Sequence, residues 1–230
     1  MGCRFVHIKS IGKMSKSFLI EKDGKYILID TGAKRDKNAV EKFLKENIDD
    51  FSRLRLIIIT HSHYDHTGNL YSVKNFTNAP VLANKREVKN IEEGIFDIPE
   101  GFTNFGRFMM KFGRDSKKEF EGVKVNICIE NEFFLHDYGF KGKIINTPGH
   151  TEGSVSVIVE KAAFVGDLCF NIPFLNSFSV LPPIGKDINC ILSSFLKLLS
   201  YNDIEKIYPA HGESFKRKKL VSTCKKFEKK

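Results

Sequence analysis

Four side chains of the kinds that bind metal ions lie within six residues of one another, in the stretch THSHYDHTG at positions 60–68. They are His61, His63, Asp65 and His66. The preceding run Leu54–Ile59 is rich in β-branched residues, which is typical of a strand buried on both faces. While that strand persists, alternation would point His61 and His63 the same way, and the following turn would direct Asp65 and His66 to a second point. The spacing therefore predicts two neighbouring metal ions.

Three later turns each carry one more residue that can bind a metal ion. TPGHT contains His150, GD contains Asp167 and AHG contains His211, and each turn follows a short apolar run that is predicted to be a strand. Strand ends are rigid positions from which a side chain can be aimed. Imidazole and carboxylate ligands without a thiolate suit Zn²⁺, Fe or Mn²⁺. The two remaining histidines, His7 and His136, match no motif and are expected to be structural or exposed.

The motifs HSHYDH, TPGHTEGS, GD and AHG, in this order and at these separations, resemble those of the metallo-β-lactamase fold superfamily. The turn Asp30–Gly32, which follows an upstream strand, matches as well. The resemblance implies an α/β fold of the αββα sandwich type, with two mixed β-sheets packed face to face, helices outside and the metals at one edge. It also implies that residues 1–230 form a single domain.

The same resemblance assigns the seven ligand-type residues to two metal sites that share one carboxylate. The first site would use His61, His63 and His150, the second would use Asp65, His66 and His211, and Asp167 would bridge both. The implied cofactors are two divalent metal ions, with Zn²⁺ expected first and Fe or Mn²⁺ as alternatives. Asp30 is expected to orient a ligand or a loop rather than to bind metal.

The implied reaction is hydrolysis, in which a metal-bridging hydroxide cleaves an ester, thioester or lactone bond. Asp65 is the residue expected to carry the proton to the leaving group, which makes it the predicted catalytic residue. Asp167 and the pair Asp65–His66, in place of a thiolate, look more like the thioesterases and lactonases of the superfamily than like its β-lactamases. The expected partner is a small-molecule substrate.

An apolar run after Asp167 is predicted to form the rim of the substrate pocket. Its members are Phe170, Ile172, Phe174, Leu175 and Phe178. These side chains favour a partly apolar substrate over a highly charged one. Only 19 residues follow His211, so we expect no helical glutathione-binding domain of the glyoxalase II type.

Other function classes stay open at this point. A mononuclear iron at His61, His150 and Asp167 would give a thiol or persulfide dioxygenase. A phosphodiesterase or another nucleic-acid-acting member of the superfamily would carry the same motifs. A regulatory protein could keep the metal site for structure alone, with the basic C-terminal segment in contact with nucleic acid. Filling of all seven ligand positions favours the hydrolase.

The net charge of +9 is concentrated at the C-terminus. The segment Lys216–Lys230 contains eight Lys or Arg and one Glu, whereas the rest of the chain has 29 basic and 27 acidic residues. Leu220, Val221, Cys224 and Phe227 have helical spacing, which predicts a helix with one buried stripe and a solvated basic face. A nucleic-acid partner is therefore not expected.

Composition is that of a globular domain, with 41% hydrophobic and 28% charged residues. The apolar runs are too short to span a membrane and no secretory signal is evident, so we expect a cytoplasmic protein without a membrane partner. Five scattered cysteines without a CxxC pair argue against a thiolate zinc site and a disulfide scaffold, and Cys169 is expected to fill the core. The phenylalanine- and glycine-rich segment 94–122 is a candidate lid or an additional part of the core.

Overall fold

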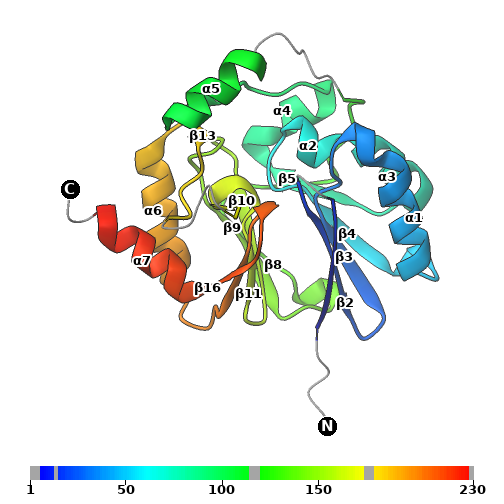
Figure 1. Ribbon diagram of the computed structural model, residues 1–230. Coiled ribbons are helices and arrows are strands. Elements are labelled where there is room, and N and C mark those ends of the chain that lie inside the picture. The colour runs from blue at the N-terminus through cyan, green and yellow to red at the C-terminus, as the bar shows by residue number, and fades with distance from the viewer. Residues whose placement is uncertain (1–5, 13–14, 114–119, 174–178, 228–230) are drawn as a thin grey trace.

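Two six-stranded β-sheets lie face to face in the computed structural model, which describes residues 6–12, 15–113, 120–173 and 179–227 (Figure 1). The first sheet has the strand order β1-β2-β3-β4-β5-β7. Its strands are β1 (His7–Ile11), β2 (Ser17–Lys22), β3 (Lys25–Ile29), β4 (Leu54–Ile58), β5 (Val81–Asn84) and β7 (Ile127–Ile129). The pair Asp23-Gly24 is typical of a two-residue hairpin turn, and it forms the turn between β2 and β3, where both residues have positive φ.

The second sheet has the order β16-β14-β11-β10-β9-β8. Its strands are β8 (Glu132–Phe134), β9 (Gly142–Asn146), β10 (Val155–Val159), β11 (Ala162–Phe164), β14 (Lys206–Tyr208) and β16 (Phe215–Lys216). Two small strand pairs lie outside the main sheets. They join β12 (Phe170–Asn171) to β15 (His211–Gly212), and β6 (Glu100–Gly101) to β13 (Ile184–Gly185).

Helices cover the outer face of each sheet (Figure 1). The α-helices among the described residues are α1 (Lys37–Asn47), α2 (Tyr64–Thr67), α3 (Leu70–Thr77), α4 (Lys85–Glu93), α5 (Asn104–Gly113), α6 (Ile188–Leu199) and α7 (Arg217–Phe227). Buried residues of α1, α3 and α4 pack on the first sheet, and those of α6 and α7 pack on the second. A third apolar cluster fills the space between the sheets, with Phe18, Ile58 and Phe164 among its members. This is the predicted αββα sandwich.

The local sequence predicts one helix from His66 or Thr67 to about Phe76, but the structure has two separate helices there, α2 and α3. The buried side chain of Asn69 lies at the break, where its amide donates hydrogen bonds of 2.8 Å to the carbonyls of Thr31 and Ala33. The break therefore lets the polypeptide dock against the turn after β3. The apolar residues of Val123–Ile129 likewise predict a strand over the whole stretch, but β7 begins only at Ile127.

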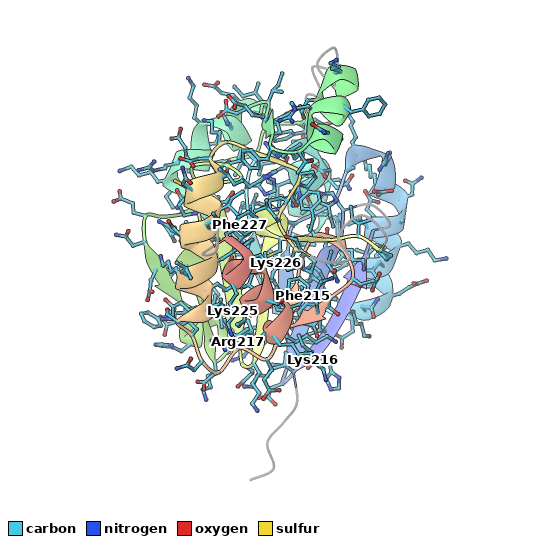
Figure 2. The ribbon with its side chains drawn as sticks, turned by 60° about the vertical axis from the view of Figure 1, so that its left-hand side comes forward. Phe215, Lys216, Arg217, Lys225, Lys226 and Phe227 are labelled. Atoms are coloured by element: carbon cyan, nitrogen blue, oxygen red, sulfur yellow. The ribbon has the colours of Figure 1, made fainter. Side chains whose placement is uncertain are left out.

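The predicted C-terminal helix is present as α7, which lies beside α6 (Figures 1 and 2). Leu220 and Cys224 are buried against the second sheet and α6, while Lys225 and Lys226 are exposed, as the stripe predicts. In the part of the chain that the structure describes, no helix is both long and apolar enough to span a membrane.

The segment 94–122 contains β6 and α5, and its residues 114–119 lie outside the described residues. β6 pairs with β13, which ties the segment to the residues just before α6. Its role as a lid and the assignment of the whole chain to one domain stay predictions.

Candidate metal centre

The predicted ligands come together at one edge of the two sheets because of strand direction. β9 and β11 both run antiparallel to β10, and β14 runs parallel to β11. The carboxyl ends of β9, β11 and β14 therefore lie at one edge of the sheet. His150, Asp167 and His211 follow these three strands. The loop after β4 reaches the same edge, where the carbonyl of Thr60 accepts a hydrogen bond from the backbone N–H of Val155 at the start of β10.

His61 and His63 lie on a loop rather than on a strand, because β4 already ends at Ile58. Strand alternation, which the sequence analysis used to bring the two imidazoles together, is therefore the wrong reason for their proximity. Their ring centroids are nevertheless 4.6 Å apart. Asp65 and His66 lie on the short helix α2 that follows.

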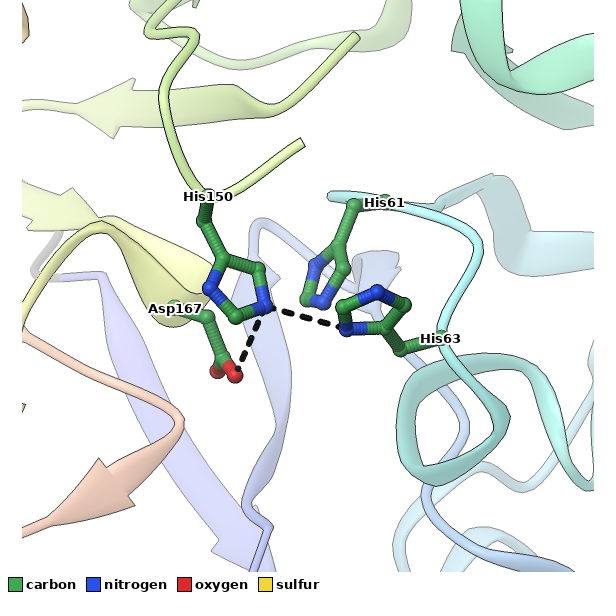
Figure 3. A group of neighbouring side chains, drawn as sticks. All are labelled: His61, His63, His150 and Asp167. Carbon is green, nitrogen blue, oxygen red and sulfur yellow. Dashed lines mark hydrogen bonds and ion pairs between the residues drawn. The ribbon is translucent and has the colours of Figure 1, made fainter. Parts of the chain in front are cut away.

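His61, His63, His150 and Asp167 form a buried cluster whose ligand atoms all lie within 4.8 Å of one another (Figure 3). Nε2 of His150 lies 3.0 Å from Nδ1 of His63 and 3.3 Å from Oδ2 of Asp167. Nε2 of His61 and Oδ1 of Asp167 are buried without a hydrogen-bond partner among the described residues. Buried polar atoms are rarely left without a partner, so this cluster has the character of a site for a cation.

Backbone carbonyls identify which nitrogen of two of these imidazoles is available to a metal. Nε2 of His63 lies 3.0 Å from the carbonyl oxygen of Asp97, and Nδ1 of His150 lies 3.2 Å from that of Ile184. A carbonyl can only accept, so those nitrogens carry the proton and the opposite nitrogens present lone pairs. The two lone pairs then face each other at 3.0 Å, an arrangement that a shared cation would stabilise.

Asp65, His66 and His211 form a second cluster that is joined to the first by Asp167. Nε2 of His211 lies 3.3 Å from Oδ2 of Asp65, and Nε2 of His66 lies 3.8 Å from the same oxygen. Oδ1 of Asp167 is 3.2 Å from Nε2 of His66, and its Oδ2 is 3.3 Å from Nε2 of His211. One carboxylate thus contacts histidines of both clusters.

Asp30 lies behind the second cluster, where sequence analysis expected an orienting residue. Its carboxylate is 2.8 Å from Nδ1 of His66 and accepts hydrogen bonds from the backbone N–H and the hydroxyl of Thr60. Gly166 has φ +51°, and a Cβ there would lie 2.7 Å from the Thr60 hydroxyl. Only glycine therefore lets the turn that carries Asp167 approach Thr60 so closely.

The imidazoles of the first cluster are neutral in the metal-free protein. Burial lowers the pKa of His61 well below its usual value, and repulsion from His66 and His63 adds to this. Burial also lowers the pKa of His63, and it lowers that of His150 to about 4. Neutral imidazole is the form that binds metal, so these three residues are ready ligands at neutral pH.

The second cluster has the opposite charge state when it holds no metal. Burial works against protonation of His66, but Asp167 and Asp30 outweigh it and raise the pKa of His66 well above its usual value. Despite its burial, His211 has its pKa raised to about 10 by Asp167 and Asp65. Burial would raise the pKa of Asp65, yet His66 and His211 lower it to about 2. A metal at this cluster would take the place of these protons.

The residues therefore fit two divalent cations. Nitrogen and oxygen donors without a thiolate suit Zn²⁺, Fe or Mn²⁺. In His63, His66 and His150, the ring nitrogen that points away from the other ligands lies within hydrogen-bond distance of a protein oxygen. This arrangement is usual for metal-binding histidines. His7 and His136 are exposed, as expected.

Aromatic side chains surround the two clusters. Phe170, from the predicted pocket rim, stacks on His211 with ring centroids 4.4 Å apart. Phe96, from the segment 94–122 that was expected to be a lid or part of the core, contacts both His63 and Tyr64, with ring centroids 5.6 and 5.5 Å apart. Of the other predicted rim residues, Ile172 is half-buried, and Phe174, Leu175 and Phe178 lie outside the described residues.

The comparisons with known proteins agree with this geometry. The family model described as the metallo-β-lactamase superfamily matches residues 11–211. The chain belongs to this superfamily. It is 32% identical over 219 residues to a probable metallo-hydrolase of Methanocaldococcus jannaschii, which covers 90% of this chain and 91% of that protein. It is therefore a metal-dependent hydrolase of the metallo-β-lactamase superfamily, as predicted.

Two further similarities are more distant. A hydroxyacylglutathione hydrolase of Haemophilus influenzae is 27% identical over 163 residues, which is 69% of each chain. The structure of the B3 metallo-β-lactamase BLEG-1 superposes with a TM-score of 0.71 at 20% identity, over 94% of this chain and 96% of that one. The structural similarity shows that the metallo-β-lactamase fold is shared.

Proposed function

We propose that the protein uses two metal ions to hydrolyse an ester, thioester or lactone bond of a small, partly apolar substrate. The observation that carries this proposal is the position of Asp167, whose carboxylate lies within 3.3 Å of histidines in both clusters. His61, His63 and His150 would hold one ion with Asp167. Asp65, His66 and His211 would hold the other with the same carboxylate. Zn²⁺ is the metal expected first.

When bound, the ions would polarise the oxygen of the substrate and lower the pKa of a water molecule. The protein's own contribution is to orient these groups and to move a proton. Asp65 is suited to proton transfer because its side chain is 19% exposed, whereas that of Asp167 is only 4% exposed. Its Oδ2 faces His211, itself 14% exposed, so substrate would approach from the side of these two residues. Asp65, which is ionised at neutral pH, would first accept the proton released by the attacking water and then pass it to the leaving group.

The class of bond is inferred from the relatives and the pocket walls. The similar protein of Haemophilus influenzae is named for hydrolysis of hydroxyacylglutathione, which supports a thioester as the first substrate to test. The half-buried Phe96–Tyr64 pair beside His63 supplies apolar surface at one end of the centre, whereas Phe170 is buried where it stacks on His211. Such surface favours an acyl or aromatic group next to the reacting bond.

The test is elemental analysis of protein purified without added metal, combined with a panel of thioesters, lactones and phosphodiesters. We expect about two metal ions per chain and turnover of a thioester or lactone that is lost on chelation and restored by metal. A single iron per chain, inert esters and oxygen uptake with a thiol would replace the proposal with a dioxygenase. Cleavage of phosphodiesters alone would replace it with the phosphodiesterase function.

A further inference from the structure

Glu87 of α4 is a buried carboxylate that lies between two of the loops of the metal centre. The residue is only 3% exposed, and no ion pair to it occurs among the residues that the structure describes. Burying a charge costs free energy unless hydrogen bonds replace its hydration. An apolar residue would fill the same helical position without that cost, so the contacts that Glu87 makes need an explanation.

The hydrogen bonds that the Glu87 carboxylate accepts from the described residues come from the two loops that carry the first cluster. Oε2 accepts one of 2.9 Å from the backbone N–H of Ser62. Oε1 accepts one of 2.8 Å from the hydroxyl of Thr151 and one of 3.0 Å from the backbone N–H of Gly153. Ser62 lies between His61 and His63, and Thr151 directly follows His150. One side chain thus bridges two loops whose contact residues, Ser62 and Thr151, are 89 positions apart in the sequence.

We infer that Glu87 is a positioning residue, which sets the separation between the loop of His61 and His63 and the loop of His150. The two loops contribute the nitrogens that face each other at 3.0 Å, and a shift of either loop would move one of these nitrogens away from a common metal ion. The inference rests on the metal centre of the proposed function. In this role Glu87 binds neither metal nor substrate, and it acts through the loops that carry His61, His63 and His150.

The close packing of Gly153 against Glu87 independently supports a specific contact between α4 and the loop after His150. A Cβ at this position would lie 2.6 Å from both Cγ and Oε1 of Glu87. The loop after His150 therefore approaches the carboxylate as closely as its backbone allows. The next turn of α4 adds a weaker contact to the other loop, since the amide of Asn90 lies 3.4 Å from the hydroxyl of Ser62.

The experiment is a metal titration of the metal-free full-length protein, with a competing chromophoric chelator for Zn²⁺ and the visible spectrum for Co²⁺. For Glu87→Gln we expect one of two binding steps to weaken about 10–100-fold, as is usual when an outer partner of a metal site is lost. Glutamine cannot replace the carboxylate, because its NH₂ group would face an N–H donor. The Co²⁺ spectrum of that step should change, and the other step should be retained.

Ile91→Val is the matched control for lost stability, since Ile91 is a buried residue one helical turn further along α4 that belongs to the apolar cluster on the first sheet. It should lower the midpoint of thermal unfolding and leave both binding steps unchanged. If Glu87→Gln does not fold, Thr151→Val removes one hydrogen bond to Glu87 and should weaken the same step to a smaller extent. Thr151→Ser keeps the hydroxyl and should bind metal at that step with the affinity of the wild-type protein.

The possible outcomes separate this inference from the proposed function. Wild-type protein that binds no metal contradicts the proposed function itself. Wild-type protein that binds two ions, together with Glu87→Gln or Thr151→Val variants that bind both with unchanged affinity and spectrum, leaves the function intact and overturns the positioning role.

Discussion

The carboxylate of Asp30 lies 2.8 Å from Nδ1 of His66, and the backbone of Asp30 adopts φ +58° to reach that position. Left-handed conformation is uncommon for residues other than glycine, although aspartate tolerates it better than most. Three donors converge on this carboxylate, namely His66 and the N–H and hydroxyl of Thr60. Asp30 therefore fixes the orientation of His66 and connects it to the end of β4.

Replacement of Asp30 by asparagine should impair the second metal site. Asparagine has one acceptor oxygen for three donors and no negative charge, so the ring of His66 would lose its orientation. We expect metal affinity at one of the two steps to fall about 10–100-fold, measured by chelator competition.

Asp23→Asn is the matched control for this change. Asp23 is an aspartate of similar backbone conformation, with φ +52°, but it lies exposed in the hairpin between β2 and β3. Asp23→Asn should leave both metal-binding steps unaltered. Equal metal affinity in wild-type and Asp30→Asn protein would show that His66 does not depend on Asp30 for its position.

Replacement of Asp65 by asparagine should separate proton transfer from metal binding. The amide oxygen can still face His211, but it cannot carry a proton to the leaving group. We expect kcat to fall about 10²–10⁴-fold at saturating metal with a smaller change in KM, as for loss of a general acid. Metal content of the same sample is the control, and unchanged kcat at full metal content would rule out the proton-transfer role.

The clustering of the candidate ligands could be predicted from the sequence because each belongs to a short local motif at the end of an apolar run. His61, His63 and His150 were expected to lie together on this basis and do so, even though strand alternation was the wrong reason for pairing the first two. The break between α2 and α3 was missed because it depends on the contact of Asn69 with Thr31, which no local pattern encodes.

Glu87 was missed for the same physical reason. Glu87 is separated from its partners Ser62 and Thr151 by 25 and 64 residues, and its helix reads as an ordinary amphipathic segment. The one available signal was a glutamate one turn before Ile91, on the apolar face of that helix. Contacts between distant segments decide such roles, and they become visible only in the folded structure.

Truncation of Phe164 should destabilise the protein without acting on the metal centre directly. Phe164 is fully buried between the sheets, with ring centroids 5.1 Å from Phe18 and 4.9 Å from Tyr208. Phe164→Ala should lower the free energy of unfolding by about 3–5 kcal/mol, measured by urea denaturation. Phe134 is 54% exposed, so Phe134→Ala should cost less than about 1 kcal/mol. Similar losses for both would contradict the position of the inter-sheet core.

The cysteines should differ sharply in reactivity. Burial raises the pKa of the Cys169 thiol well above its usual value, and Cys224 nearby adds to this, so almost no thiolate forms at pH 8. Cys128 is exposed. Iodoacetamide at pH 8, followed by peptide mass spectrometry, should therefore label Cys128 in the native protein and Cys169 only after unfolding in urea. Since the raised pKa opposes ionisation, a moderate increase in pH should not change this order. Native labelling of Cys169 at the rate of Cys128 would show that the turn after Asp167 opens to solvent, and it would contradict the rigid placement of the bridging carboxylate.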